Sequence, residues 1–276
     1  MKLLKHLWAL ALILTSLATS HLVAQAPTRP QFVVLTKTHW NMNAENTPDM
    51  RANWMSMEKE YLDKVTKKND YVFSTALLTH YYTADNSEVI QVHTYKTWDD
   101  IEKAQMKFDE LEKAAWPDEA KRNAFMDKLD NSYENRHSDN IYATLDGAKL
   151  RNEDTNDSSL VVYMQIRYLA YPEDGSNAEF EKLRMEYNQK VIQKNPHILS
   201  YYPMRHAWGQ DNREFVNAYV VKSLCDVEAL NEAWPGLIQA AWPDEAQRKA
   251  FFDKYDKYFD GVHGDYIYTM IPALGK

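Results

Sequence analysis

The sequence predicts an α+β fold made of two similar halves, each with the element order strand, helix, strand, strand, helix, strand. Two observations predict it. The segment Ala-Ala-Trp-Pro-Asp-Glu-Ala at residues 114–120 recurs at residues 240–246, and over 114–142 and 240–268 the two copies are identical at 17 of 29 positions. Elsewhere, apolar residues alternate as in strands or recur every three or four residues as in amphipathic helices. The chain is therefore a tandem duplication, with a shift of 126 between the copies.

Each half begins with a strand and an amphipathic helix. The strand at residues 32–40 matches a strand at 160–168. Apolar residues spaced by three and four then fall on one face of a helix. This stripe consists of Trp54, Met57, Tyr61 and Val65 in the first half and of Phe180, Leu183, Tyr187 and Val191 in the second.

The remaining elements are a hairpin, a broken helix and a last strand. Strands at residues 72–82 and 88–96 flank Asp85-Asn86, which we interpret as a two-residue hairpin turn. The helical pattern that starts near Ile101 is interrupted at Trp116-Pro117, and proline suits the first turn of a second helical piece. Residues 137–145 supply the final strand.

This order gives a four-stranded antiparallel sheet with helices on one face, so its other face must be covered. In a duplicated chain the second sheet is the natural cover. The element order, the duplication and the stretch Phe-Val-Asn-Ala-Tyr-Val-Val-Lys-Ser at residues 215–223 resemble the dimeric α/β-barrel superfamily over residues 30–273, and more loosely its NIPSNAP-like and antibiotic-biosynthesis-monooxygenase-like branches. The resemblance implies two ferredoxin-like βαββαβ units that pack sheet to sheet as an intrachain pseudo-dimeric α/β barrel. The expected divisions are a signal peptide at 1–26, a first unit at 27–148, a linker at 149–159 and a second unit at 160–276.

The first 26 residues have the pattern of an export signal. A basic start at Lys2 and Lys5 precedes an apolar run, and Ala24-Gln25-Ala26 has the small-x-small pattern of a cleavage site. The apolar run is about 12 residues, well short of the roughly 20 that span a bilayer. We therefore expect an exported protein, periplasmic or extracellular, that is not inserted in a membrane once the signal is removed.

Composition excludes several functions. The net charge is −8, and phosphate binding depends on clustered Lys and Arg, so no nucleic-acid partner is expected. Only seven glycines occur, and neither GxGxxG nor GxxxxGK[ST] is present. A single cysteine, Cys225, rules out an internal disulfide and a multi-cysteine metal site, and no base is paired with it.

The space between the two sheets is the expected ligand site. With the two-residue turn, His80 would pair with Gln91, and His206 with Asn217. Side chains alternate along a strand, so this register selects one face of each strand. Converging polar and aromatic groups in a concavity are typical of a ligand site. The predicted lumen residues are Lys37, His39, His80, Gln91, His93, Tyr95, Tyr163, Gln165, Arg167, His206, Asn217 and Tyr219.

Three functions are compatible with this lumen. The first is an exported protein that binds a small organic molecule, with no cofactor and no metal. The second, implied by the resemblance, is a cofactor-independent monooxygenase or a haem-handling enzyme, with His80 and His206 as catalytic candidates. A metal or haem at His39, His80 and His93 is the less favoured form of this alternative. The third is a structural barrel that binds a protein partner on its outside. The chain would act as a monomeric pseudo-dimer or form a higher homo-oligomer.

Two repeated motifs have a structural interpretation. His137-x-Asp139 and His263-x-Asp265 could orient an imidazole for acid–base chemistry, but we favour a structural role, because the whole stretch around them is repeated. Trp116 is expected to pack at the helix break, as is Trp242.

Overall fold

The computed structural model describes residues 29–42, 50–150 and 160–276. The export signal predicted at residues 1–26 lies outside the described residues, as does most of the predicted linker.

The order of elements is the predicted one in both halves. The strands are β1 (Phe32–His39), β2 (Ser74–Tyr82), β3 (Glu88–Tyr95), β4 (Ser138–Thr144), β5 (Leu160–Leu169), β6 (Ser200–Trp208), β7 (Glu214–Val221) and β8 (Phe259–Met270). The α-helices are α1 (Met50–Lys64), α2 (Asp99–Ala115), α3 (Glu119–Asp130), α4 (Asn177–Lys190), α5 (Leu224–Ala241) and α6 (Glu245–Asp256). Short 3₁₀ turns are η1 (Thr66–Lys68), η2 (Ile192–Lys194) and η3 (Pro272–Leu274).

The break between α2 and α3 follows from its sequence. The side chain of Asp118 accepts a hydrogen bond from the backbone N–H of Lys121 and so caps the new helix. Asp244 caps α6 in the same way. Trp116 stacks on Phe125 with ring centroids 4.3 Å apart, and the equivalent Trp242 stacks on Phe251 at 4.1 Å. The repeated tryptophans thus pack where each helix turns back, as predicted.

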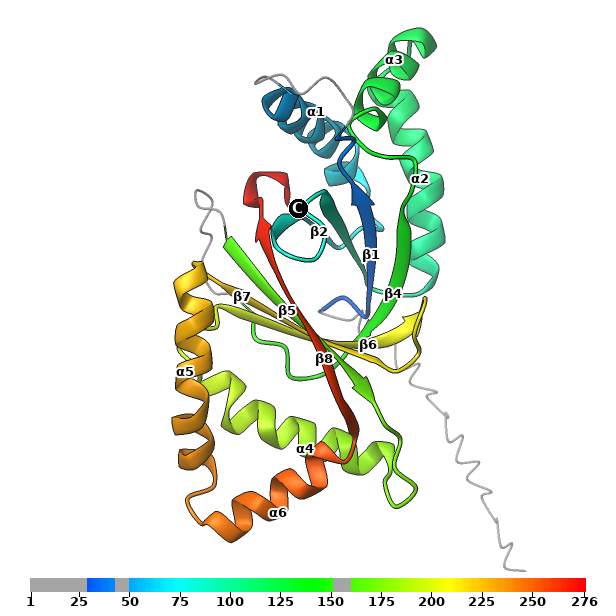
Figure 1. Ribbon diagram of the computed structural model, residues 1–276. Coiled ribbons are helices and arrows are strands. Elements are labelled where there is room, and N and C mark those ends of the chain that lie inside the picture. The colour runs from blue at the N-terminus through cyan, green and yellow to red at the C-terminus, as the bar shows by residue number, and fades with distance from the viewer. Residues whose placement is uncertain (1–28, 43–49, 151–159) are drawn as a thin grey trace, which may run out of the picture.

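The eight strands close into one antiparallel barrel, in the order β1-β3-β2-β8-β5-β7-β6-β4. Within each half the order is that of a ferredoxin-like unit. The two sheets also pair along their edges, β2 with β8 and β4 with β6. The helices α1–α3 and α4–α6 cover opposite sides of this barrel (Figure 1). The predicted fold, two βαββαβ units forming a pseudo-dimeric barrel in one chain, is confirmed.

The interior of the barrel is a largely apolar core. All eight strands contribute to one cluster of buried side chains, which includes Val33, Leu78, Val162, Val216 and Tyr268. Separate clusters hold the helices to the outside of the sheets, such as Tyr163 and Tyr219 with Leu230 of α5. The residues predicted for a polar lumen are therefore not all gathered in this interior, because the described residues pack in two layers, one inside the barrel and one between the sheets and the helices.

The predicted hairpin register is wrong. Leu78 lies opposite Ile90, and Leu77 lies opposite Gln91. Five residues, 83–87, connect β2 to β3, where the sequence analysis assumed a two-residue turn. The resulting slip is an odd number of residues, which moves Gln91 and His93 to the opposite face of the sheet.

The second-half strand β5 was also assigned to the wrong face. Val33 lies opposite Thr94, and Val162 lies opposite Val220, the residue 126 positions after Thr94. The first strands of the two halves are therefore related by a shift of 129, whereas the sequence alignment of 32–40 with 160–168 assumed 128. This single-residue difference turns Tyr163, Gln165 and Arg167 from the barrel interior towards the helices.

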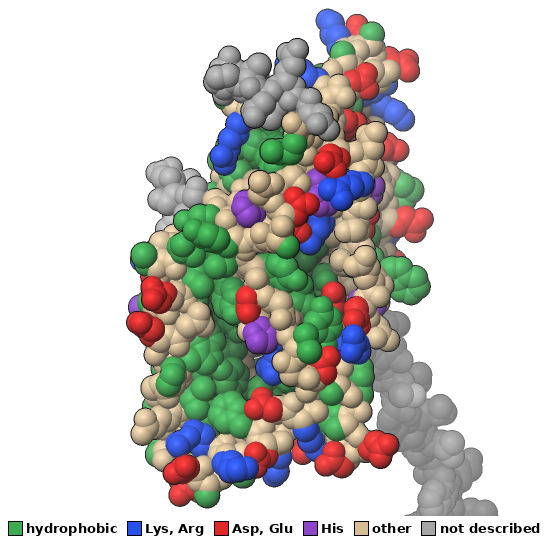
Figure 2. Space-filling model, in the orientation of Figure 1, with side chains coloured by type: hydrophobic (Ala, Val, Ile, Leu, Met, Phe, Trp, Pro, Cys, Tyr) green, Lys and Arg blue, Asp and Glu red, His purple; other side chains and the backbone are tan. Residues whose placement is uncertain are grey.

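On the face shown in Figure 2, acidic and basic side chains are interspersed over the helices. Within the described part of the chain, no helix combines the length and apolar character needed to cross a bilayer.

Candidate functional site

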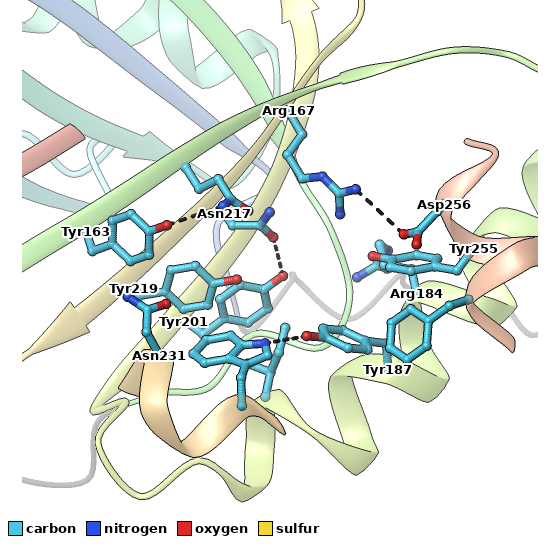
Figure 3. A pocket seen from close by; sticks show the side chains of 14 residues that line it. Tyr163, Arg167, Arg184, Tyr187, Tyr201, Asn217, Tyr219, Asn231, Tyr255 and Asp256 are labelled. Atoms are coloured by element: carbon cyan, nitrogen blue, oxygen red, sulfur yellow. Dashed lines mark hydrogen bonds and ion pairs between the residues drawn. The ribbon is translucent and has the colours of Figure 1, made fainter. Parts of the chain in front are cut away.

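A cavity lies between the sheet of the second half and its three helices (Figure 3). We call it the second-half cavity. It has a volume of about 190 Å³ and is lined by strands β5, β6 and β7 and by α4, α5 and α6. Five tyrosines line it, together with Trp234, Asn217, Arg167 and Arg184; the tyrosines are Tyr163, Tyr187, Tyr201, Tyr219 and Tyr255.

Some of these polar groups have partners. The hydroxyl of Tyr201 donates to Oδ1 of Asn217 at 2.7 Å, and Nε1 of Trp234 donates to the hydroxyl of Tyr187. The guanidinium of Arg184 donates to the carbonyl oxygen of Asp146 and to the carboxylate of Glu181. These contacts fix the wall of the cavity.

Two hydroxyls in the wall have no partner. Tyr219 and Tyr255 are 4% and 5% exposed, yet neither hydroxyl is hydrogen-bonded to a described residue. Neither oxygen is among the fully buried, unpartnered side-chain atoms of the described residues, so both are accessible from the cavity. The cavity thus presents hydrogen-bonding capacity that a bound molecule can satisfy.

The tyrosines are donors at neutral pH. Burial raises the pKa of Tyr255 to about 12, and burial raises the pKa of Tyr219 well above its ordinary value. Both hydroxyls therefore keep their protons. They can donate hydrogen bonds to an acceptor, and they do not serve as bases.

Arg167 supplies the available positive charge. Its guanidinium lies 3.4 Å from the centroid of the Phe259 ring, and its Nη2 is 3.9 Å from Oδ1 of Asp256. That separation exceeds a hydrogen bond, and no described residue accepts a hydrogen bond from the guanidinium. Burial raises the pKa of the Asp256 carboxyl, against the influence of Arg167. The ion pair is loose, so a ligand anion can compete for Arg167.

The local sequence explains why these helices face the sheet. Ser176 and Ser223 cap the N-termini of α4 and α5, because their side chains accept hydrogen bonds from backbone N–H groups. The stripe that begins at Phe180 then turns towards the sheet and carries Tyr187 into the cavity wall.

The structure divides the predicted site residues among four places. Five of them line the second-half cavity: Tyr163, Gln165, Arg167, Asn217 and Tyr219. Gln91 and His93 line a corresponding cavity in the first half. Tyr95 also faces the helices but lies outside both cavities, where it packs with Val72 and Ala104.

The other four predicted residues lie on the barrel-facing side of their strands. Lys37 forms an ion pair with the buried carboxylate of Glu88. Nε2 of His39 is 3.5 Å from Asp85, and its Nδ1 is buried without a hydrogen bond.

The two catalytic candidates are in this last group, and neither lines the cavities under the helices. Nδ1 of His80 is 2.7 Å from Oγ1 of Thr83, beside a shallow surface depression. Nε2 of His206 is buried without a partner among the described residues. Their proposed role in catalysis has no support from this placement.

The three histidines suggested for a metal or haem do not form one site. His39 and His80 face the barrel, whereas His93 faces the helices. Among the described residues, no group of three or more His, Cys, Asp or Glu side chains is placed to hold a metal ion. No histidine lines the second-half cavity, and His93 lies in the first-half cavity beside three carboxyl groups.

The residues that the helices contribute to the cavity were not predicted as site residues from the sequence. Tyr187 was assigned to an apolar stripe, and Arg184, Trp234 and Tyr255 were not singled out. A signal did exist, because Arg184 is a cation on the side of α4 that also carries Phe180 and Tyr187.

Comparisons with known proteins show the fold. A candidate monooxygenase from Fusobacterium nucleatum subsp. nucleatum superposes with a TM-score of 0.53 at 11% identity, over 89% of this chain and 94% of that chain. An anthrone oxidase-like protein gives 0.51 at 10% identity, over 88% and 92%. A variant of chlorite dismutase from Candidatus Nitrospira defluvii gives 0.51 at 13% identity, over 89% and 93%. No family model and no curated protein matches the sequence. The chain thus has the dimeric α/β-barrel fold that its sequence predicts.

Proposed function

We propose that the second-half cavity binds a small planar aromatic molecule that carries an anionic oxygen, such as a benzoate. The observation that supports this most strongly is the combination of Arg167 with the unpaired hydroxyls of Tyr219 and Tyr255 in a wall of aromatic rings. A guanidinium and two phenols are donors that suit a carboxylate or phenolate.

The size of the cavity supports a single ring. Its volume is about 190 Å³, and an apolar cavity of about 150 Å³ is known to hold benzene. Rings such as Tyr219 and Trp234, which meet edge to face with centroids 5.7 Å apart, offer flat surfaces against which such a ligand packs.

The test is calorimetric titration of the purified chain with benzoate and with its neutral analogue benzamide. Benzoate is expected to bind more tightly than benzamide. Arg167→Met is expected to weaken benzoate binding roughly 10- to 100-fold, because it removes one charge-assisted hydrogen bond. Tyr219→Phe is expected to cost about 3- to 10-fold because it removes one neutral donor.

Arg213→Met is the matched control for charge. Arg213 is a half-exposed arginine that pairs with Asp211 and Asp260 and does not line the cavity, so its loss is expected to leave binding unchanged. Equal effects of the Arg167 and Arg213 substitutions would contradict the proposal, as would equal binding of benzoate and benzamide.

Oxidation of the bound aromatic is a second candidate function. The likeness to a candidate monooxygenase and to an anthrone oxidase-like protein favours it. In that reaction the tyrosines and Arg167 would hold the substrate and stabilise an anionic form of it. Oxygen uptake that depends on a hydroxylated aromatic, and that falls in Arg167→Met, would support this function.

Export is part of the proposal. It rests on residues 1–26, which have the features of a cleavable signal. N-terminal sequencing of protein recovered from outside the cytoplasm is expected to begin at Pro27.

A further inference from the structure

The first half contains a cavity at the position equivalent to the second-half cavity. We call it the first-half cavity; it has a volume of about 380 Å³ and lies between β2, β3 and the helices α1, α2 and α3. Pairs of residues related by the shift of 126 line the two cavities. Nine such pairs occur, among them Tyr61 and Tyr187, Gln91 and Asn217, His93 and Tyr219, Met126 and Phe252, and Asp130 and Asp256.

The charges of the two cavities are opposite. The ionisable groups of fixed charge in the second-half wall are two arginines and one aspartate. In the first-half wall they are Glu58, Glu112 and Asp130, with no lysine or arginine among the lining residues. Glu58 occupies the position of Arg184, and the register places Thr38 where the second half has Arg167. Both copies thus keep the cavity, but the fixed charges of its lining are mainly positive in the second half and negative in the first.

Two of these acids are held in place by tyrosines. The hydroxyl of Tyr133 donates to Glu58 and accepts a hydrogen bond of 2.7 Å from Nε1 of Trp54. The hydroxyl of Tyr61 donates to Oε1 of Glu112 at 2.7 Å. Desolvation raises the pKa of Glu58, and also that of Asp130. Among the described residues, no cation forms an ion pair with Glu58, Glu112 or Asp130 to offset this desolvation.

His93 is an independent indication of a ligand. Its imidazole lies in the wall of the cavity, has an edge-to-face contact with Phe108, and makes no hydrogen bond to a described residue. Burial lowers its pKa to about 4, so the ring is neutral at pH 7. One of its nitrogens is then free to accept a hydrogen bond. The nearby Lys276 is already bound by backbone carbonyls, with its Nζ 2.7 Å from the oxygens of Asn69 and Val72.

We propose that the first-half cavity binds a protonated organic amine whose N–H groups donate to the neighbouring acids Glu58 and Asp130. Among the described residues, no three His, Cys, Asp or Glu side chains are placed to hold a metal ion together, whereas an ammonium group needs only one or two acceptors of the wall. Carboxylates and a neutral imidazole are all acceptors, so a primary ammonium suits them better than a quaternary one. The larger volume accommodates an apolar body attached to the amine.

Calorimetric titration with 2-phenylethylamine, 2-phenylethanol and trimethyl(2-phenylethyl)ammonium tests this proposal at neutral pH. The primary amine is expected to bind at least about tenfold more tightly than the alcohol, and more tightly than the quaternary ion. Glu58→Gln is expected to lower the affinity for the primary amine by at least about tenfold. If that variant does not fold, Asp130→Asn provides the same comparison.

Glu60→Gln is the matched control, since Glu60 lies on the same helix and pairs with Lys64 outside the cavity. It is expected to leave amine binding unchanged. Failure of the amine to bind, equal binding of amine and alcohol, or equal effects of the two glutamate substitutions would overturn the proposal. Benzoate provides a separate readout, because Glu58→Gln should not change the binding of benzoate to the second-half cavity. The proposals for the two cavities can therefore be refuted independently.

Amine binding should also depend on pH. The groups that face Glu58 are Tyr133, which donates to it, Trp54, whose Nε1 donates to the Tyr133 hydroxyl, the phenol of Tyr61 and the acid Asp130. Because burial raises the pKa of Glu58, this carboxylate takes up its proton at a higher pH than an exposed glutamate does. Affinity for the amine is therefore expected to fall as the pH is lowered towards that raised pKa, and Glu58→Gln should remove this part of the pH dependence. An unchanged pH profile in the variant would contradict the assignment.

Discussion

Replacing Trp54 by alanine is expected to destabilise the protein by about 3–5 kcal/mol, the range for a large aromatic removed from a core. Trp54 is 0% exposed, its ring meets that of Trp40 with centroids 4.5 Å apart, and its Nε1 holds Tyr133. The side chain joins α1 to the outside of the sheet, so its loss leaves a cavity in the layer that carries the first-half cavity. Urea unfolding of the full chain at neutral pH measures the change.

Trp98→Ala is the control for this substitution. Trp98 is 48% exposed and touches Phe32 edge to face, so its loss should cost less than about 1 kcal/mol. Trp54→Phe should lie between the two variants, because it keeps most of the packing and removes the N–H that binds Tyr133. Equal destabilisation by the Trp54 and Trp98 substitutions would contradict the core that we describe.

The elements of this fold were readable because their signals are local. Trp116-Pro117-Asp118 combines a break with an N-cap, and the structure uses both. The stripe from Trp54 to Val65 identified the first helix without any knowledge of its partners. The duplication doubled each of these signals, so a pattern that is weak once became convincing when repeated.

The direction in which the side chains of each strand point was harder to predict. It depends on the exact number of residues in each loop, and an error of one residue exchanges the two faces of a strand. One loop of five residues instead of two reversed Gln91 and His93. An error of one residue in the alignment of β1 with β5 placed Arg167 and its neighbours on the wrong face of β5. Composition did not correct the error, because the true barrel core contains Tyr142 and Tyr268, which are no less polar than the tyrosines in the cavity wall.

The helix side of the site was harder still to predict. A tyrosine such as Tyr187 has an apolar ring and a polar tip, so it fits an apolar stripe and also serves in a cavity wall. Only the fold shows that the three helices of each half meet the sheet around a hollow. Only a comparison of the two cavities then reveals that Glu58 in the first half occupies the position of Arg184 in the second.

Removing Lys37 is expected to have the second large effect, because it leaves a buried acid without its cation. Glu88 is 5% exposed inside the barrel; it forms an ion pair with Lys37 and accepts a hydrogen bond of 3.3 Å from Tyr268. Breaking an enclosed ion pair by removing one partner costs about 3–5 kcal/mol. Since the Lys37 side chain is 37% exposed, we expect Lys37→Met to cost somewhat less, about 2–3 kcal/mol.

A double-mutant cycle separates this effect from simple loss of packing. Adding Glu88→Gln to Lys37→Met should recover most of the lost stability, since a neutral amide can still accept from Tyr268 and needs no cation. The duplication supplies the control, because Glu214 is the equivalent acid and accepts a 2.6 Å hydrogen bond from Tyr142 without an ion pair to a described residue. Glu214→Gln combined with Lys37→Met should therefore give additive losses. If Glu88→Gln and Glu214→Gln both behaved additively with Lys37→Met, the ion pair would not be what stabilises the charge of Glu88, and the cost would have to be assigned to the lysine chain itself.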